Sequence, residues 1–143
     1  PMFQPSQQEV RRFFCQVYGK QQRAQTLDPL ESLAAEWIRS HPEYHDLLSQ
    51  EELALHAQFP EGQTNPFLHL SMHLSISEQC SIDQPRGTRQ AVNLLASKQS
   101  DRHQAHHQVM ECLGVMLWES QRSGLPPDGQ AYVAAVSRLA TRD

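Results

Sequence analysis

Two pairs of histidines, each spaced by four residues, are the residues of this sequence best suited to chemistry. The first pair is His69 and His73; the second is His103 and His107, and Glu111 continues it at the same interval. In a helix, residues four apart lie on the same face. Imidazole nitrogens and carboxylate oxygens are ligands that zinc and other divalent transition metals accept in helical bundles. We therefore predict that these five residues form a metal site, with zinc favoured, if the two helices are neighbours.

The histidine spacing has an alternative explanation. The zinc-protease motif HExxH and the paired Glu-x-x-His motifs of di-iron bundles are both absent from the sequence. Buried histidines can instead be hydrogen-bonded and serve only packing. The protein would then be a non-catalytic helical interaction protein that works through a surface groove or a dimer face. Whether it is an enzyme stays open, although a metal-bound water beside Glu111 could support hydrolysis.

The segment around the first histidine pair is expected to be buried. It runs from Asn65 to Cys80 and, as a helix, is apolar nearly all round, so other helices should cover most of it. His69 and His73 then have few routes to water. A buried imidazole without a polar partner costs roughly 1 to 3 kcal/mol, so we expect something to satisfy both rings.

Two other groups of residues are candidate sites. The segment His41-Pro42-Glu43-Tyr44-His45 could bind a metal or substrate from a loop, but a turn with Tyr44 packed inward is favoured. The three cysteines lie far apart in the sequence and form no CxxC pair, so we expect small buried apolar side chains and no disulfide. They are Cys15, Cys80 and Cys112.

The elements that must position these residues are all predicted to be helices. Capping residues mark the helix starts, and no alternating strand pattern of useful length occurs. We predict an all-α fold, a compact bundle of about six or seven helices, in a single helical domain over residues 1–143. The predicted helix starts and stops are Ser6 with Glu9, Asp28-Pro29, His41-Pro42 as a stop, Ser49 with Glu52, Asn65-Pro66, Ser100 or Asp101, Gly124 as a stop, and Asp128.

Composition excludes several classes of protein. Twelve Lys and Arg residues stand against 16 Asp and Glu residues, and the basic residues form no stripe, so we expect no nucleic-acid partner. No stretch approaches the roughly 18 uninterrupted apolar residues of a membrane span. We expect a cytoplasmic protein with no membrane partner. Other partners are unknown from the sequence, and a homo-oligomer is left open.

Several segments together resemble a known family. They are NPFLHLSMHL at 65–74, IDQPRG at 82–87 and HQAHHQVMECLG at 103–114, with HPEYH at 41–45. They are similar to the bacterial family called domain of unknown function 1841, which implies a bacterial cytoplasmic origin but no activity. By this resemblance, the five predicted ligands match family motif positions. His106 replaces a different polar residue, and Val115 stands where the family tends to have glutamate.

Overall fold

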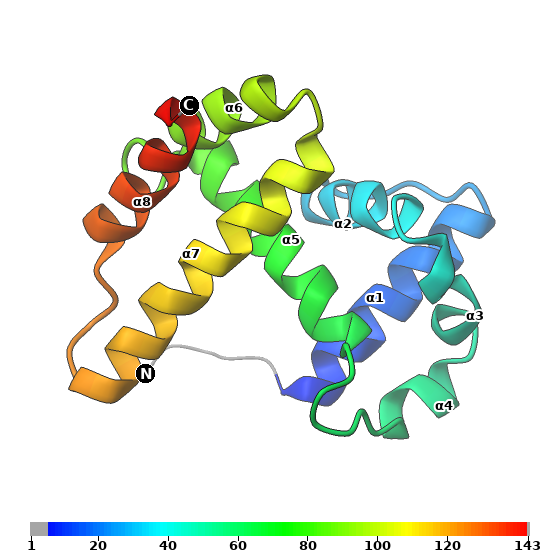
Figure 1. Cartoon of the computed structure of the whole chain (residues 1–143). Coiled ribbons are helices and arrows are strands. Elements are labelled where there is room, and N and C mark those ends of the chain that lie inside the picture. Colours follow the sequence, from blue (N-terminus) through cyan, green and yellow to red (C-terminus); the bar gives the residue numbers. More distant parts are fainter. Residues whose placement is uncertain (1–5, 143) are drawn as a thin grey trace. The chain divides into compact units, whose positions relative to one another are not determined.

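The structure, a computed structural model, describes residues 6–142. Over that range all of its regular secondary structure is helical, and turns and loops connect the helices. The predicted all-α class is confirmed (Figure 1). Eight α-helices and one short 3-10 helix follow one another along the described chain. They are α1 (Gln7–Gln22), α2 (Pro29–Arg39), η1 (Pro42–Tyr44), α3 (His45–Leu48), α4 (Glu51–His56), α5 (Pro66–Ile82), α6 (Thr88–Gln99), α7 (Arg102–Ser123) and α8 (Gly129–Thr141).

The chain divides into two compact units. The first ends at Leu74 and contains α1 to α4 with the first half of α5. The second begins at Ser75 and contains the rest of α5 with α6, α7 and α8. Each unit is described below by itself, and the expectation of a single domain over residues 1–143 stays a prediction.

Capping side chains start the helices at the residues that the sequence indicated. Ser6 and Asp28 each form a capping box, in which the cap and the glutamate three residues later satisfy each other's backbone amides. Asn65 Oδ1 accepts hydrogen bonds from the first amides of α5. Asp101 and Asp128 cap α7 and α8 in the same way. These local interactions explain why most of the boundaries could be predicted.

The number of helices differs from the prediction of six or seven. Between α2 and α5 the sequence predicted one short helix, opening at Ser49 and Glu52, whereas the structure has η1, α3 and α4 there. These elements have three, four and six residues, too few for an apolar period to be read from the sequence. Ser49 ends α3, and Gln50 precedes α4 without a side-chain cap.

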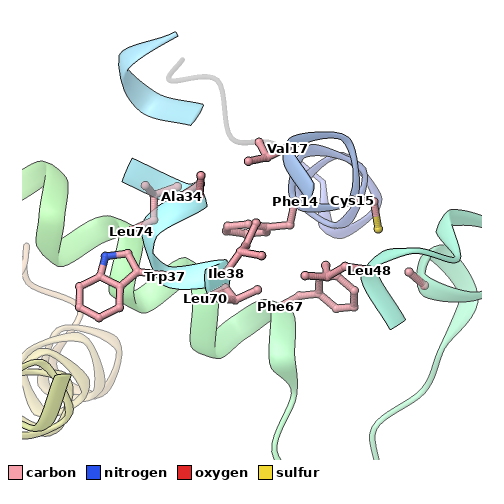
Figure 2. Close-up of a cluster of buried hydrophobic side chains, with 12 residues drawn as sticks. Phe14, Cys15, Val17, Ala34, Trp37, Ile38, Leu48, Phe67, Leu70 and Leu74 are labelled. Atoms are coloured by element: carbon pink, nitrogen blue, oxygen red, sulfur yellow. The ribbon is translucent and has the colours of Figure 1, made fainter. Parts of the chain in front are cut away.

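The first unit has its own hydrophobic core, formed by α1, α2, α3, α4 and the first half of α5 (Figure 2). Phe14 of α1, Ile38 of α2 and Leu70 of α5 are essentially inaccessible to solvent. Cys15 belongs to this core, and its burial raises the pKa of the thiol to about 11. The predicted role of this cysteine as a small apolar residue is therefore confirmed.

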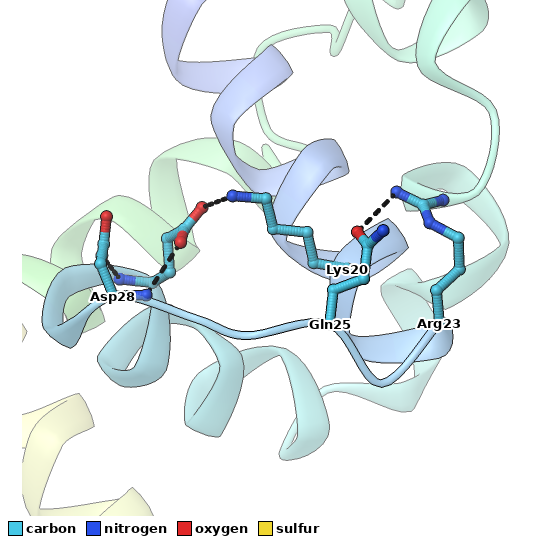
Figure 3. Close-up of polar contacts among 5 residues, drawn as sticks. Lys20, Arg23, Gln25 and Asp28 are labelled. Carbon is cyan, nitrogen blue, oxygen red and sulfur yellow. Dashed lines mark hydrogen bonds and ion pairs between the residues drawn. The ribbon is translucent and has the colours of Figure 1, made fainter.

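An ion pair links α1 to α2 at the edge of the first unit. Lys20 Nζ lies 2.7 Å from Glu31 Oε2, while the other oxygen of Glu31 accepts the backbone amide of Asp28 (Figure 3). These contacts lower the pKa of Glu31, first through the backbone hydrogen bond at Asp28 and then through Lys20. The Lys20 side chain is still 36% exposed to solvent, which screens the ion pair, so we expect the pair to contribute little stability.

The second unit packs α6 against both α7 and α8. Val92, Val109 and Val136, one from each of these helices, are buried. Tyr132 is buried as well, and its hydroxyl donates a hydrogen bond of 2.6 Å to Gln79 Oε1 in the second half of α5. Gly129 begins α8 where a Cβ atom would come within 2.6 Å of the Pro85 ring, so this close approach requires glycine.

We predict that Leu70→Ala destabilises the protein by about 2–5 kcal/mol, because Leu70 is fully buried and its removal leaves a cavity. The matched control is Leu53→Ala on α4, where the side chain is 55% exposed and the change should stay within about 0.5 kcal/mol. Chemical denaturation followed by circular dichroism measures both values. Equal effects of the two substitutions would contradict the assignment of Leu70 to the core.

Candidate metal centre

Three histidines lie together in the first unit. His69 and His73 lie in successive turns of α5, and His41 is the residue directly before η1. Their ring centroids are 4.8 to 5.0 Å apart, and one ring nitrogen from each lies within 4.8 Å of the others. His41 and His73 are buried, and His69 is partly buried. The predicted first pair is thus joined by a third imidazole.

The backbone fixes the proton on the His41 ring. Its Nδ1 lies 2.7 Å from the carbonyl oxygen of Trp37, one helical turn earlier at the end of α2. A carbonyl oxygen can only accept, so Nδ1 carries the proton and Nε2 carries the lone pair. Metal-binding histidines are commonly oriented in this way, by donating the other ring nitrogen to a carbonyl or carboxylate. His41 therefore has the tautomer that binding through Nε2 requires.

Aromatic rings flank the three histidines. The Trp37 indole stacks on His73 with centroids 4.0 Å apart and planes 13° from parallel. Tyr44 stacks on His41 with centroids 5.1 Å apart and planes 4° apart, and its burial, aided by Glu43, raises the pKa of the phenol. These contacts restrict the rotation of the imidazole rings and hold the ring positions before any ligand binds.

His41 is the member of the cluster that is not among the five ligands predicted from the sequence. The sequence favours a turn over residues 41–45 with Tyr44 packed inward, and in the structure Tyr44 stacks on the His41 ring. The signal was present in the sequence. The histidine follows an apolar helix end that contains Trp37, and Pro42 directly after it turns the chain there. His45, by contrast, directs its Nε2 to the carbonyl of Ile38, 2.7 Å away.

The second histidine pair lies in the second unit. His103 and His107 are in successive turns of α7, both partly buried, with ring centroids 4.6 Å apart. Their neighbour His106 is buried, and its pKa is lowered to about 3, chiefly by that burial and then by Arg102 and the two adjacent imidazoles. His106 is thus neutral and belongs to the buried face of α7, together with Val109 and Met110.

Glu111 lies one turn further along α7, exposed, and lines a groove between α7 and α8. Its role as a metal ligand stays a prediction.

The two cysteines of the second unit are poor nucleophiles, because burial raises the thiol pKa of both Cys80 and Cys112. Among the described residues all three cysteines are free thiols.

This arrangement is a histidine cluster that could hold a metal ion, carried by an all-helical protein. Over residues 6–142, no helix is both long enough and apolar enough to cross a membrane. The family model for the domain of unknown function DUF1841 matches residues 6–138, so the chain belongs to this family. Searches of the curated proteins and of the solved structures returned no match.

We predict that the neutral ring of His41 carries its proton on Nδ1, whereas that of His45 carries it on Nε2, because each of these nitrogens faces a carbonyl oxygen. Long-range ¹H–¹⁵N NMR correlation distinguishes the two tautomers at about pH 8, above the ordinary histidine pKa of about 6.5. His56, exposed on α4, serves as the unrestrained reference. A proton on Nε2 of His41 would rule out the orientation described here.

Proposed function

We propose that this protein binds a divalent transition metal through its clustered histidines, with zinc favoured. The observation that carries the proposal is the gathering of His41, His69 and His73 in the first unit, with one ring nitrogen of each within 4.8 Å of the others. Three neutral imidazoles supply three lone pairs in one small volume. A single cation can accept all three at once, which is how helical proteins bind zinc and related metals.

The hydrogen bonding of His41 supports metal binding over simple packing. A histidine that served only packing could donate from either ring nitrogen. Here the Trp37 carbonyl holds the proton on Nδ1, so that Nε2 keeps the lone pair needed for coordination. The stacked rings of Trp37 and Tyr44 restrict the motion of His73 and His41. The entropic cost of ordering these two ligands when a metal binds is therefore smaller.

The α7 residues His103, His107 and Glu111 enter the proposal as the ligands predicted from the sequence. A tetrahedral zinc shell needs four ligands, and the first unit supplies three imidazoles. We propose that His103 or His107 provides the fourth, with Glu111 as a further candidate. The support is chemical: the two histidines have the same spacing and a similar ring separation to the pair on α5, and both are partly buried, as His69 is.

The ligand set supports binding better than catalysis. Four imidazoles close a tetrahedral shell and leave no position for a water molecule to be activated. Metal binding of this kind stabilises the folded chain, because the unfolded chain has no preformed site. The function that we propose is therefore stable retention of one metal ion, and hydrolysis would require that one of the four positions stay open.

We expect the protein, purified without an affinity tag or chelator, to retain about one metal ion per chain by elemental analysis. His69→Gln and His41→Gln should each weaken zinc binding by more than about 100-fold, beyond what loss of a residue that only orients a ligand costs. Removal of the metal by a chelator should lower the melting temperature of the original protein. The matched control, His56→Gln at an exposed position of α4, should behave as the original.

A second measurement keeps the test independent of variant folding. In a Trp118→Phe background Trp37 is the remaining tryptophan, and it stacks on His73 at 4.0 Å. Saturable quenching of its fluorescence by Cu²⁺ or Co²⁺ is the expected result. Absence of both quenching and retained metal in folded protein would reject the proposal. If the double variant His103→Gln, His107→Gln kept the zinc affinity of the original protein, only the part of the proposal that assigns a ligand to α7 would be wrong.

A further inference from the structure

The C-terminal half of α7 exposes large apolar side chains. Beyond Leu113 no residue of this helix is buried, although the helix continues to Ser123. Large apolar side chains nevertheless occur there: Val115 and Trp118 are each more than half exposed, as is Leu125 just after the helix. Val115 and Leu125 line the same groove, and exposed apolar patches larger than those of an ordinary surface mark interaction sites.

A groove of about 790 Å³ runs along this part of α7, with α8 as its other wall. Val115 and Met116 line it from α7, and Ala135 and Leu139 line it from α8. The two helices are joined by a short connection, residues 124–128, so they run in roughly opposite directions along the groove. An antiparallel helix pair with an apolar inner face is half of a four-helix bundle.

The charges of the groove are distributed unevenly along its length. Glu119 and Asp128 lie near the connection between the helices. Glu119 forms an ion pair with Arg122 of the same helix, so this end of the groove keeps a net negative charge that comes chiefly from Asp128. Arg138 lies in the last turn of α8 and Arg142 directly after it, at the opposite end, where Glu111 is the one acidic residue among the described residues that line the groove. The groove is thus acidic at one end and net basic at the other.

This distribution of charge along the groove is complementary to that of a second copy of the same chain. When the two-fold axis of a pair is perpendicular to the groove, the two grooves run in opposite directions, so one end of each groove meets the other end of its copy. The acidic end at Glu119 and Asp128 then faces Arg138 and Arg142 of the second copy, while the apolar floors meet in the middle. We propose that two copies of this chain pair through the α7–α8 groove, completing a four-helix bundle from α7 and α8 of each.

The proposal does not depend on the metal centre, so its test is made in the presence of a chelator. Sedimentation velocity of the full chain over roughly 1–100 μM should show a reversible dimer. Val115→Asp places a charge in the apolar floor and should raise the dissociation constant at least about 10-fold. Leu53→Asp, at a similarly exposed apolar position of α4, is the matched control and should leave the dissociation constant unchanged.

Charge reversal tests the two-fold geometry directly. Arg138→Glu and Glu119→Arg should each weaken the dimer, because each places like charges opposite one another. Combining the two substitutions in one chain, or mixing the two single variants, should restore pairing, because opposite charges face each other again. A chain that stays monomeric throughout, or a dimer that survives Val115→Asp and both charge reversals, overturns the proposal, as does a groove occupied by another ligand in monomeric protein.

Discussion

The structure depends on the constraint that an imidazole buried in an apolar core must keep its polar nitrogens satisfied. A buried polar group left without a partner costs roughly 1–3 kcal/mol, a substantial part of the net stability of a small protein. The first unit nevertheless buries His73 completely and His41 nearly so, beside a core of aliphatic and aromatic side chains. The groups that surround these rings come from the end of α2 and from η1: the Trp37 carbonyl accepts from His41, Trp37 stacks on His73 and Tyr44 stacks on His41.

The turn at the end of α2 is the structural feature that makes the cluster. Pro42 disfavours helical geometry in the preceding residue, so α2 stops before His41 and the chain changes direction there. Because the turn is tight, the His41 ring lies back against the Trp37 carbonyl and Trp37 itself stacks on His73. Residues 37–41 therefore supply three parts of the cluster: the His41 ring, the Trp37 carbonyl that orients it, and the Trp37 indole that stacks on His73.

Much of the fold follows from local sequence signals, and the site follows from them only in part. The capping residues Ser6, Asp28 and Asn65 determine helix starts through contacts within a few residues, which a sequence reveals. The spacing of His69 and His73 likewise places two rings on one face of α5. The approach of His41 is a long-range contact, and no period in the sequence encodes it. The same holds for the α7–α8 groove, since apolar residues such as Val115 look like core residues until the packing is known.

If the clustered histidines bind zinc, the coordination shell of the metal must consist mainly of imidazole nitrogens. X-ray absorption at the zinc edge, recorded on zinc-loaded full chain, reports the number and type of ligands and their distances. We expect three or four imidazole nitrogens at about 2.0–2.1 Å, with the multiple-scattering pattern of the rings. A shell dominated by oxygen, by the sulfur of Cys80 or Cys112, or by a single imidazole would contradict the account, because the clustered histidines would then not be the metal ligands.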